Sequence, residues 1–327
     1  MKDLIQNLQS SPQLKEKTAI ANLWNFLPDT VNIEGKNVFL GDDAAAIGNS
    51  GEYLLLAAEG VYQPLLKSNP YLAGRTSVST NVSDIYAMGG RPVAILDVLF
   101  SSNNKEIKEV LSGIYDNSTR YGVPVVGGHI NSESKESALV VSILGKAKKL
   151  LTSFNATDGD DLLMVTNPIG KFIQDNNYWD SSSELKKKEL LKQLEILPTI
   201  AEEGLADTAK DISMAGAIGS ILMLLECSEK GAEIFIDNIS VPKSVSLDKW
   251  LLTFPSYGFV LSLRPENSIK VKKIFTMHGL LCESVGKVTK SKKIYFIKNR
   301  KKELFWDLNA HPYIGINASE SVRVING

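Results

Sequence analysis

Residues 38–45 read VFLGDDAA, an apolar run that ends in a glycine and two adjacent carboxylates. The apolar run predicts a short strand, and Gly41 permits a sharp turn directly after it. Two acids side by side at a strand end are costly to hold together unless a cation or a basic group neutralises them. Mg²⁺ suits Asp42 and Asp43, because hard divalent ions prefer carboxylate oxygens. The alternative is a solvated turn in which one side chain caps the backbone.

Residues 70–88 predict a helix that begins at a proline and ends before a Gly-Gly pair. Most of its residues are small or apolar, which indicates that much of the helix is buried. Asn81 and Asp84 nevertheless lie three residues apart, on one face. A buried carboxylate needs a cation or strong donors, so this pair is a candidate metal or phosphate contact. An aspartate that is hydrogen-bonded within the interior is the alternative.

Two more predicted strands end in groups that can carry chemistry. Glu59 follows the apolar run at 53–58, and His129 follows a strand at 123–126 through two glycines. Glycines at such a place let a ligand or a neighbouring backbone approach closely. His129 is a candidate general base or ligand, because imidazole titrates near neutrality, and a plain loop residue is the alternative.

The segment at 211–219 is a candidate phosphate cradle. It reads DISMAGAIG and leads into a predicted helix, with Asp211 or Ser213 as the cap. Gly216 and Gly219 let a phosphate approach the helix N-terminus. The segment is not a P-loop, because the Gly-Lys-Ser/Thr ending is absent. Together with the acids of the first half, it predicts a Mg²⁺–nucleotide site.

Length and composition indicate an ordinary two-domain globular protein. The chain has 327 residues, more than one core usually supports, and we place the domain boundary near residue 150. Helices and strands mix in a similar order in residues 1–150 and 151–327, which predicts two α+β domains. A net charge of −1 gives no global attraction to nucleic acid or to an anionic membrane. Two cysteines, no signal-like N-terminus and no run of ~20 apolar residues predict a cytoplasmic protein.

Taken in order, these segments resemble the AIR-synthase-like superfamily of ATP-binding enzymes, also called PurM-like. Its members include aminoimidazole ribonucleotide synthetase, thiamine-monophosphate kinase, selenophosphate synthetase and the hydrogenase-maturation carbamoyl dehydratase. The sequence most resembles the proteins called AIR synthase-related. The matching segments are GDDAA at 41–45, AEGV at 58–61, NVSDIYAMGGRP at 81–92, GVPVVGGH at 122–129, KDISMAGAIGSILMLLECS at 210–228 and FPSYGFVLSLRPE at 254–266.

The resemblance implies a two-domain α+β fold that homodimerises. Strands from both N-terminal domains would form one shared β-barrel, and the C-terminal domain would be an α/β sandwich. ATP and Mg²⁺ are the implied cofactors. The metal ligands implied by the resemblance are Asp42, Asp43, Asp84 and Glu59, the last standing where thiamine-monophosphate kinase has an aspartate. The implied nucleotide contacts are Asn81 and a phosphate roof formed by Asp211, Gly216 and Gly219.

Three departures from the family pattern bear on the reaction. His129 replaces the acid of the kinase's Gly-Gly-Asp motif, and residues 213–216, Ser-Met-Ala-Gly, replace its Ser-Asp-Gly. The sequence also lacks the N-terminal Cys/Sec–Lys loop of selenophosphate synthetase and the C-terminal cysteine of the carbamoyl dehydratase. Neither of those two nucleophiles is therefore expected.

We accordingly predict an ATP- and Mg²⁺-dependent enzyme that phosphorylates a small molecule at a carbonyl, amide or acid oxygen, with His129 as candidate acid/base. A thiamine-monophosphate kinase-like phosphotransferase and a nucleotide-binding regulatory subunit without turnover are the alternatives. The segments at 171–183 and 306–327 are expected to contribute substrate contacts. A homodimer is expected, and no nucleic-acid or membrane partner.

Overall fold

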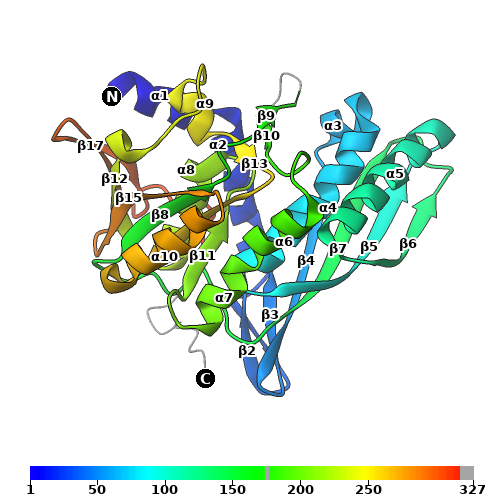
Figure 1. The fold of residues 1–327 in the computed structure, drawn as a ribbon, viewed down its shortest axis with the longest axis horizontal. Coiled ribbons are helices and arrows are strands. Elements are labelled where there is room, and N and C mark those ends of the chain that lie inside the picture. Colours follow the sequence, from blue (N-terminus) through cyan, green and yellow to red (C-terminus); the bar gives the residue numbers. More distant parts are fainter. Residues whose placement is uncertain (174–176, 317–327) are drawn as a thin grey trace.

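Two β-sheets lie side by side in the computed structural model, which describes residues 1–173 and 177–316 (Figure 1). One sheet is built from residues 45–147 and the other from residues 161–307. Helices pack on both sheets, so the α+β class predicted from the sequence is confirmed. No helix in the described ranges is long and apolar enough to cross a membrane.

Five strands form the sheet of the first half: β3 (Ala45–Asn49), β4 (Glu52–Gly60), β5 (Arg91–Phe100), β6 (Val125–Asn131) and β7 (Ala138–Ala147). They pair in the order β3-β4-β7-β5-β6, and β5 and β6 alone run parallel among them. A separate hairpin, β1 (Thr30–Ile33) with β2 (Lys36–Phe39), precedes them.

Side chains alternate between the two faces of this sheet. Helices α3 (Gln63–Ser68), α4 (Pro70–Ala87) and α5 (Asn104–Tyr121) cover one face (Figure 1). Leu55 and Ile95 are buried on that side, in one cluster with residues of α4. Leu56 and Leu96 point the other way and are 51% and 47% exposed. Within one chain the sheet is therefore open, and its second face is apolar.

Helix α4 runs between the sheet and α5 and is buried along most of its length. The side chain of Asn69 caps its start by accepting a hydrogen bond from the backbone N–H of Leu72 at 3.0 Å. Gly74 permits the close contact with α5, because a Cβ there would lie 2.1 Å from the carbonyl oxygen of Val110. The helix predicted over 70–88 is thus found, with its polar residues held in the interior.

Seven strands form the sheet of the second half: β8 (Asp161–Thr166), β11 (Thr208–Asp211), β12 (Gly231–Phe235), β14 (Gly258–Leu263), β15 (Leu281–Thr289), β16 (Lys293–Lys298) and β17 (Lys301–Asp307). They pair in the order β11-β14-β8-β15-β12-β16-β17. A small sheet adds β9 (Lys171–Phe172), β10 (Tyr178–Asp180) and β13 (Phe254–Pro255), and η2 (Ile236–Asn238) is a 3₁₀ turn.

Helices cover this second sheet on both faces. Those on one side are α6 (Lys187–Leu194), α7 (Ile196–Glu202) and α10 (Pro265–Met277), and those on the other are α8 (Gly216–Cys227) and α9 (Leu247–Leu251). Leu162 and Leu163, neighbours in β8, accordingly belong to two different buried clusters. This arrangement is the α/β sandwich expected for the second domain.

An N-terminal arm, residues 2–25, precedes the first sheet in sequence but packs on the second. It consists of α1 (Lys2–Ser10), α2 (Pro12–Lys17) and the 3₁₀ helix η1 (Thr18–Asn25). Ile20, Leu23, Trp24 and Leu27 recur at the spacing of an α-helix, but residues 18–25 form a 3₁₀ helix instead. A 3₁₀ helix has three residues per turn, so this spacing no longer defines one face. Leu23 and Leu27 are accordingly 49% and 45% exposed.

The boundary predicted near residue 150 falls between the two sheets, whose strands end at residue 147 and resume at residue 161. Leu151 nevertheless belongs to a buried cluster that holds residues of both sheets. The division into 1–150 and 151–327 therefore stays a prediction, and residues 317–327 lie outside the described part of the chain.

Candidate functional site

Three aspartates from distant parts of the sequence meet at one point. Asp43 lies in the loop before β3, Asp84 lies in α4, and Asp211 ends β11. One carboxylate oxygen of each lies within 4.8 Å of the others. The sequence predicts the first two as metal ligands and Asp211 as part of a phosphate roof, and the structure brings all three together. Three converging carboxylates suit a divalent cation.

Asp84 lies in an unfavourable environment for a charged carboxylate. The residue is only 4% exposed, and its Oδ2 has no hydrogen-bond partner within the described ranges. Burial raises the pKa of Asp84 well above its ordinary value, and the charges of Asp211, Glu59 and Asp43 raise it further. A cation among these oxygens would offset both effects. The orphaned oxygen and the crowded acids therefore fit a Mg²⁺ ion.

Lys210 is a buried cation that the sequence analysis did not single out. Its Nζ forms an ion pair with Asp43, whose other oxygen accepts a hydrogen bond from the backbone N–H of Asp211 at 3.1 Å. Burial pulls the pKa of Lys210 down, but the carboxylates of Asp43 and Asp42 outweigh burial and raise it overall. The lysine therefore stays charged and holds Asp43 in place. Its contact depends on two distant segments meeting, which no local pattern indicates.

The two adjacent acids of the opening motif have separate surroundings. Asp42 accepts hydrogen bonds from the hydroxyl of Thr152, from the backbone N–H of Ser153 at 3.0 Å and from the Ser153 hydroxyl at 2.7 Å. Asp43 turns instead toward Asp84 and Asp211. Asp42 thus ties its loop to the start of the second half, and it is not part of the three-carboxylate cluster.

The segment after β11 differs from its prediction. The sequence predicts a helix capped by Asp211 or Ser213, but Asp211 pairs with Phe259 as the last residue of its strand, and α8 begins only at Gly216. Between them the chain turns through Ala215, which has a left-handed φ of 79°. A Cβ at Gly216 would lie 2.3 Å from the carbonyl oxygen of Leu251, so helix packing requires glycine there.

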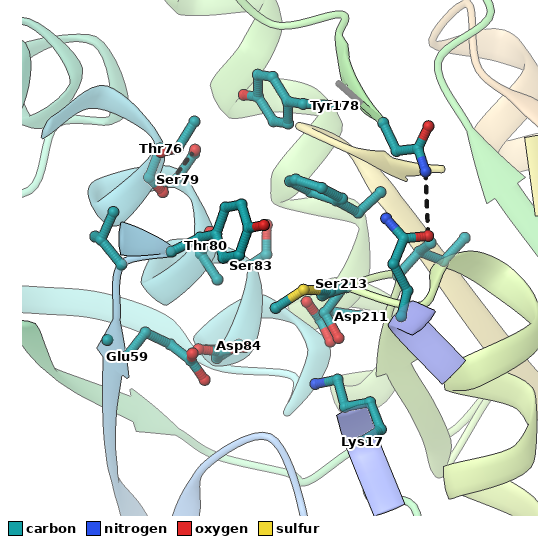
Figure 2. Close-up of a pocket in the computed structure, with 18 of the residues that line it drawn as sticks. Lys17, Glu59, Thr76, Ser79, Thr80, Ser83, Asp84, Tyr178, Asp211 and Ser213 are labelled. Atoms are coloured by element: carbon teal, nitrogen blue, oxygen red, sulfur yellow. Dashed lines mark hydrogen bonds between the residues drawn. The ribbon is translucent and has the colours of Figure 1, made fainter. Parts of the chain in front are cut away.

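A cavity of about 840 Å³ opens beside the aspartate cluster. Glu59 lines it from β4 and directs its carboxylate toward Asp84 (Figure 2). Ser213 and Met214 line it from the turn before α8, whereas neither Gly216 nor Gly219 does. The glycine-rich segment therefore borders the cavity through its first residues only.

A row of hydroxyl groups from α4 leads away from the aspartates. Thr76, Thr80 and Ser83 line the cavity at helical spacing, together with Ser79 (Figure 2). At 1.5 Å rise per residue, Thr76 lies about 12 Å along the helix axis from Asp84. The sequence TSVSTNVSD carries this pattern, and its periodicity could have revealed it. The cavity thus has a carboxylate end and a neutral hydroxyl end.

Two predicted residues lie elsewhere. Asn81 is fully buried, donates its side-chain amide to the carbonyl oxygen of Ser77 at 2.8 Å, and does not line the cavity. His129 lies in β6, one residue beyond Gly128. In strand register, Gly128 is in line with Glu59 across β5 and β7. Because neighbours along a strand face opposite ways, His129 is directed to the open face of the sheet.

Each of the two segments expected to contact substrate supplies a residue to the cavity wall. Tyr178, within 171–183, lines the hydroxyl end of the cavity, where its ring lies 5.3 Å from that of Phe254. Ile314, within 306–327, lines the cavity as well. The rest of these predictions, at 174–176 and 317–327, concerns residues outside the described ranges.

Two family models match long segments of the chain. The model of the AIR synthase related protein N-terminal domain matches residues 41–147, and that of the C-terminal domain matches residues 164–299. The chain belongs to the AIR synthase-related family. A relative from Synechocystis, an uncharacterized protein, is 44% identical over 86% of this chain and 88% of its own length. The thiamine-monophosphate kinase of Pyrococcus horikoshii is 27% identical over 83% of this chain and 89% of its own length.

Solved structures support the same PurM-like fold. Thermotoga maritima PurL complexed with ATP superimposes with a TM-score of 0.72 at 18% identity. The match covers 96% of this chain, which spans only 50% of the PurL chain. A ThiL complexed with AMPPCP and TMP gives a TM-score of 0.62 at 17% identity, over 81% of this chain and 89% of that protein. At these identities the likeness concerns the fold alone.

Proposed function

We propose that this member of the AIR synthase-related family is an ATP- and Mg²⁺-dependent enzyme that transfers a phosphoryl group to a small molecule. The observation that carries the proposal is the cluster of Asp43, Asp84 and Asp211 at one end of a cavity of about 840 Å³. Such a volume is in the range of small-molecule sites. PurL in complex with ATP and ThiL in complex with AMPPCP, both of this fold, support a nucleotide as one ligand.

The chain's own residues divide the work between holding and positioning. Asp43, Asp84 and Asp211 would hold Mg²⁺, with Glu59 as a further ligand from β4. The ion supplies charge neutralisation at the phosphates when it is bound. Lys210 fixes the orientation of Asp43 through their ion pair. Catalysis then rests on in-line positioning of the nucleotide and the acceptor, with little covalent chemistry by the protein.

Four further residues predicted from the sequence would hold the elements of the site in position without contacting its ligands. Asp42 anchors the loop that carries Asp43, through its hydrogen bonds to residues 152 and 153. Asn81 bonds within α4, one turn before Asp84. Gly216 and Gly219 allow α8 to pack closely and so set the position of the turn at 212–215. We assign these four residues to positioning.

We place the acceptor molecule at the hydroxyl end of the cavity. Thr76 donates its proton to the carbonyl oxygen of Leu72 at 3.0 Å, and Ser79 donates to that of Thr76 at 3.1 Å. Hydroxyls committed in this way offer lone pairs, which favour a ligand that carries N–H or O–H donors.

A homodimer is the second part of the proposal. The open face of the five-stranded sheet exposes Leu56, Leu96 and Leu144, and one apolar face of a sheet is usually covered by another layer. A second copy of the same face would close the two sheets into one barrel. His129 lies on this face, so we assign it to the interface between copies instead of to the cavity of its own chain.

Two experiments test the enzyme against the alternative of a regulatory subunit without turnover. Calorimetric titration with ATP should give Mg²⁺-dependent heat, and its absence above a Mg²⁺-free control would remove both readings. Incubation with ATP and a panel of neutral amides, amines and alcohols should release ADP with at least one compound. Binding without any ADP or AMP would favour the regulatory subunit.

A further inference from the structure

The N-terminal arm, residues 2–25, lies outside both segments matched by the family models, because the first of these segments begins at residue 41. It nevertheless forms part of the cavity wall, through Gln13, Glu16, Lys17 and Ile20. We propose that this arm completes the site, and that the Lys17 ammonium contacts the outer phosphates of the bound nucleotide. This inference rests on the proposed function, because it takes a nucleotide as the ligand.

The arm is fixed on the second half by contacts along its length. Leu8 and Leu14 are buried in the cluster that contains the residues of α8. Gln9 donates its amide to the carbonyl oxygen of Phe305 at 2.6 Å, and the indole N–H of Trp24 donates to that of Ile314 at 2.6 Å. Lys17 lies between these two anchors at the end of α2. Its position over the cavity is therefore set by the fold.

Lys17 points into the carboxylate end of the cavity, toward Asp84 and Asp211 (Figure 2). Within the described ranges it has no ion pair at 4.0 Å or less. Lys210, the other lysine of the cavity wall, is already paired with Asp43. Lys17 is thus the unpaired cation among the described residues that line the cavity.

The charges of the cavity explain why such a cation is needed. Six carboxylates line it, from Glu16, Asp42, Asp43, Glu59, Asp84 and Asp211, against the two lysines. A triphosphate is strongly anionic and is repelled by unpaired carboxylates. Asp43, Asp84 and Asp211 would hold a metal ion, which would neutralise part of the phosphate charge. Lys17 points toward the same carboxylate end and would neutralise phosphate charge that the metal leaves unbalanced.

Three variants separate this role from a structural one. Lys17→Gln removes the charge, Lys17→Arg keeps it, and Lys15→Gln removes an exposed charge from the same helix that does not line the cavity. Calorimetry with Mg²⁺ should show Lys17→Gln binding AMPPCP about tenfold or more weakly, the scale of one charge-assisted hydrogen bond. The affinity of Lys17→Gln for ADP, which lacks the outermost phosphate, should fall less. Lys17→Arg should retain most of the affinity, and Lys15→Gln all of it.

Titration with Mg²⁺ alone should show an effect of Lys17→Gln opposite to its effect on nucleotide affinity. Removing a positive charge near the carboxylates should strengthen metal binding by Lys17→Gln while nucleotide binding weakens. A merely structural role would weaken both, and would overturn the inference. Wild-type nucleotide affinity in Lys17→Gln would overturn it as well while leaving the proposed function intact. If the wild-type protein binds no nucleotide, the proposed function fails and the inference fails with it.

Discussion

Asp84 and Asp211 lie 127 positions apart in the sequence, yet each offers a carboxylate oxygen within 4.8 Å of the other. One comes from a helix of the first half and the other from a strand of the second, so the site forms only when the two halves meet. Two buried acids at this distance repel each other unless one is protonated or a cation lies between them. If the proposed metal site is correct, metal binding stabilises the contact between the halves.

Replacement of Asp84 tests that link directly. Asp84→Asn keeps the size of the side chain but removes a buried charge whose Oδ2 has no partner in the described ranges. We expect Mg²⁺-dependent ATP binding to disappear in calorimetry, while the metal-free variant melts at the same temperature as the wild type or higher. Full-strength Mg²⁺-dependent binding by the variant would remove Asp84 from the metal site.

The pH dependence of stability follows from Asp211. Burial raises its pKa from 3.8 to about 8, and the charge of Asp43 contributes to the same shift. A carboxyl with a higher pKa in the folded chain stabilises the fold where it is protonated. That stability is lost as pH rises from about 4, where the unfolded chain releases the proton, to about 8. Without Mg²⁺, wild type should therefore lose melting temperature relative to Asp211→Asn between pH 5 and pH 8.

Mg²⁺ supplies the control for this measurement. Because the ion binds the ionised carboxylates, it should raise the melting temperature of the wild type more at pH 8 than at pH 5. Asp211→Asn should show a smaller Mg²⁺ effect at both values. A wild-type curve that stays parallel to the variant across this range would contradict the assignment.

Asp42 should affect stability more than metal binding. Its carboxylate accepts hydrogen bonds from Thr152 and Ser153, and a hydrogen bond to a charged group contributes about 1.5–3 kcal/mol. We expect Asp42→Ala to lower the free energy of unfolding by about 3 kcal/mol in urea titrations. Mg²⁺ affinity, measured at a temperature where the variant is folded, should change less than it does in Asp43→Ala. The reverse order would return Asp42 to the metal site.

The acids of the site could be predicted from the sequence because each one ends or interrupts an apolar segment. Asp43 follows β2, Glu59 lies near the end of β4 and Asp84 interrupts a buried helix, so local pattern alone makes them conspicuous. Lys17 and Lys210 carry no such signal. Their function depends on which side chains they meet, and those meetings are set by the docking of the arm and by strand β11. For Asp42 and His129 the sequence pattern misleads in the other direction. Their motifs suggested that both lie at the metal site, but Asp42 binds residues 152 and 153, and His129 faces the open side of the sheet.

Glu226 should hold in place the backbone of residues 313–315, which borders the cavity at Ile314. Its carboxylate accepts hydrogen bonds from the backbone N–H groups of Tyr313, Ile314 and Gly315 at 2.8, 2.6 and 3.2 Å. Glu226→Ala leaves these donors without their acceptor, so we expect faster amide hydrogen exchange at residues 313–315. Exchange in β8, which pairs with a strand on each side, serves as the control and should keep its protection. Unchanged exchange at 313–315 would contradict this role.

Substitutions on the open face of the first sheet test the homodimer. Leu96 and Leu144 are 47% and 36% exposed in the single chain and lie on neighbouring strands. A charge there would be buried without a partner in a two-copy barrel, so Leu96→Asp and Leu144→Asp should each convert a dimer into monomers in light scattering coupled to size-exclusion chromatography. Ile269→Asp, on a residue 83% exposed on α10, is the matched control and should leave the dimer intact. A monomeric wild type would contradict the proposed barrel, and dimers in both Leu→Asp variants would place the interface on another face.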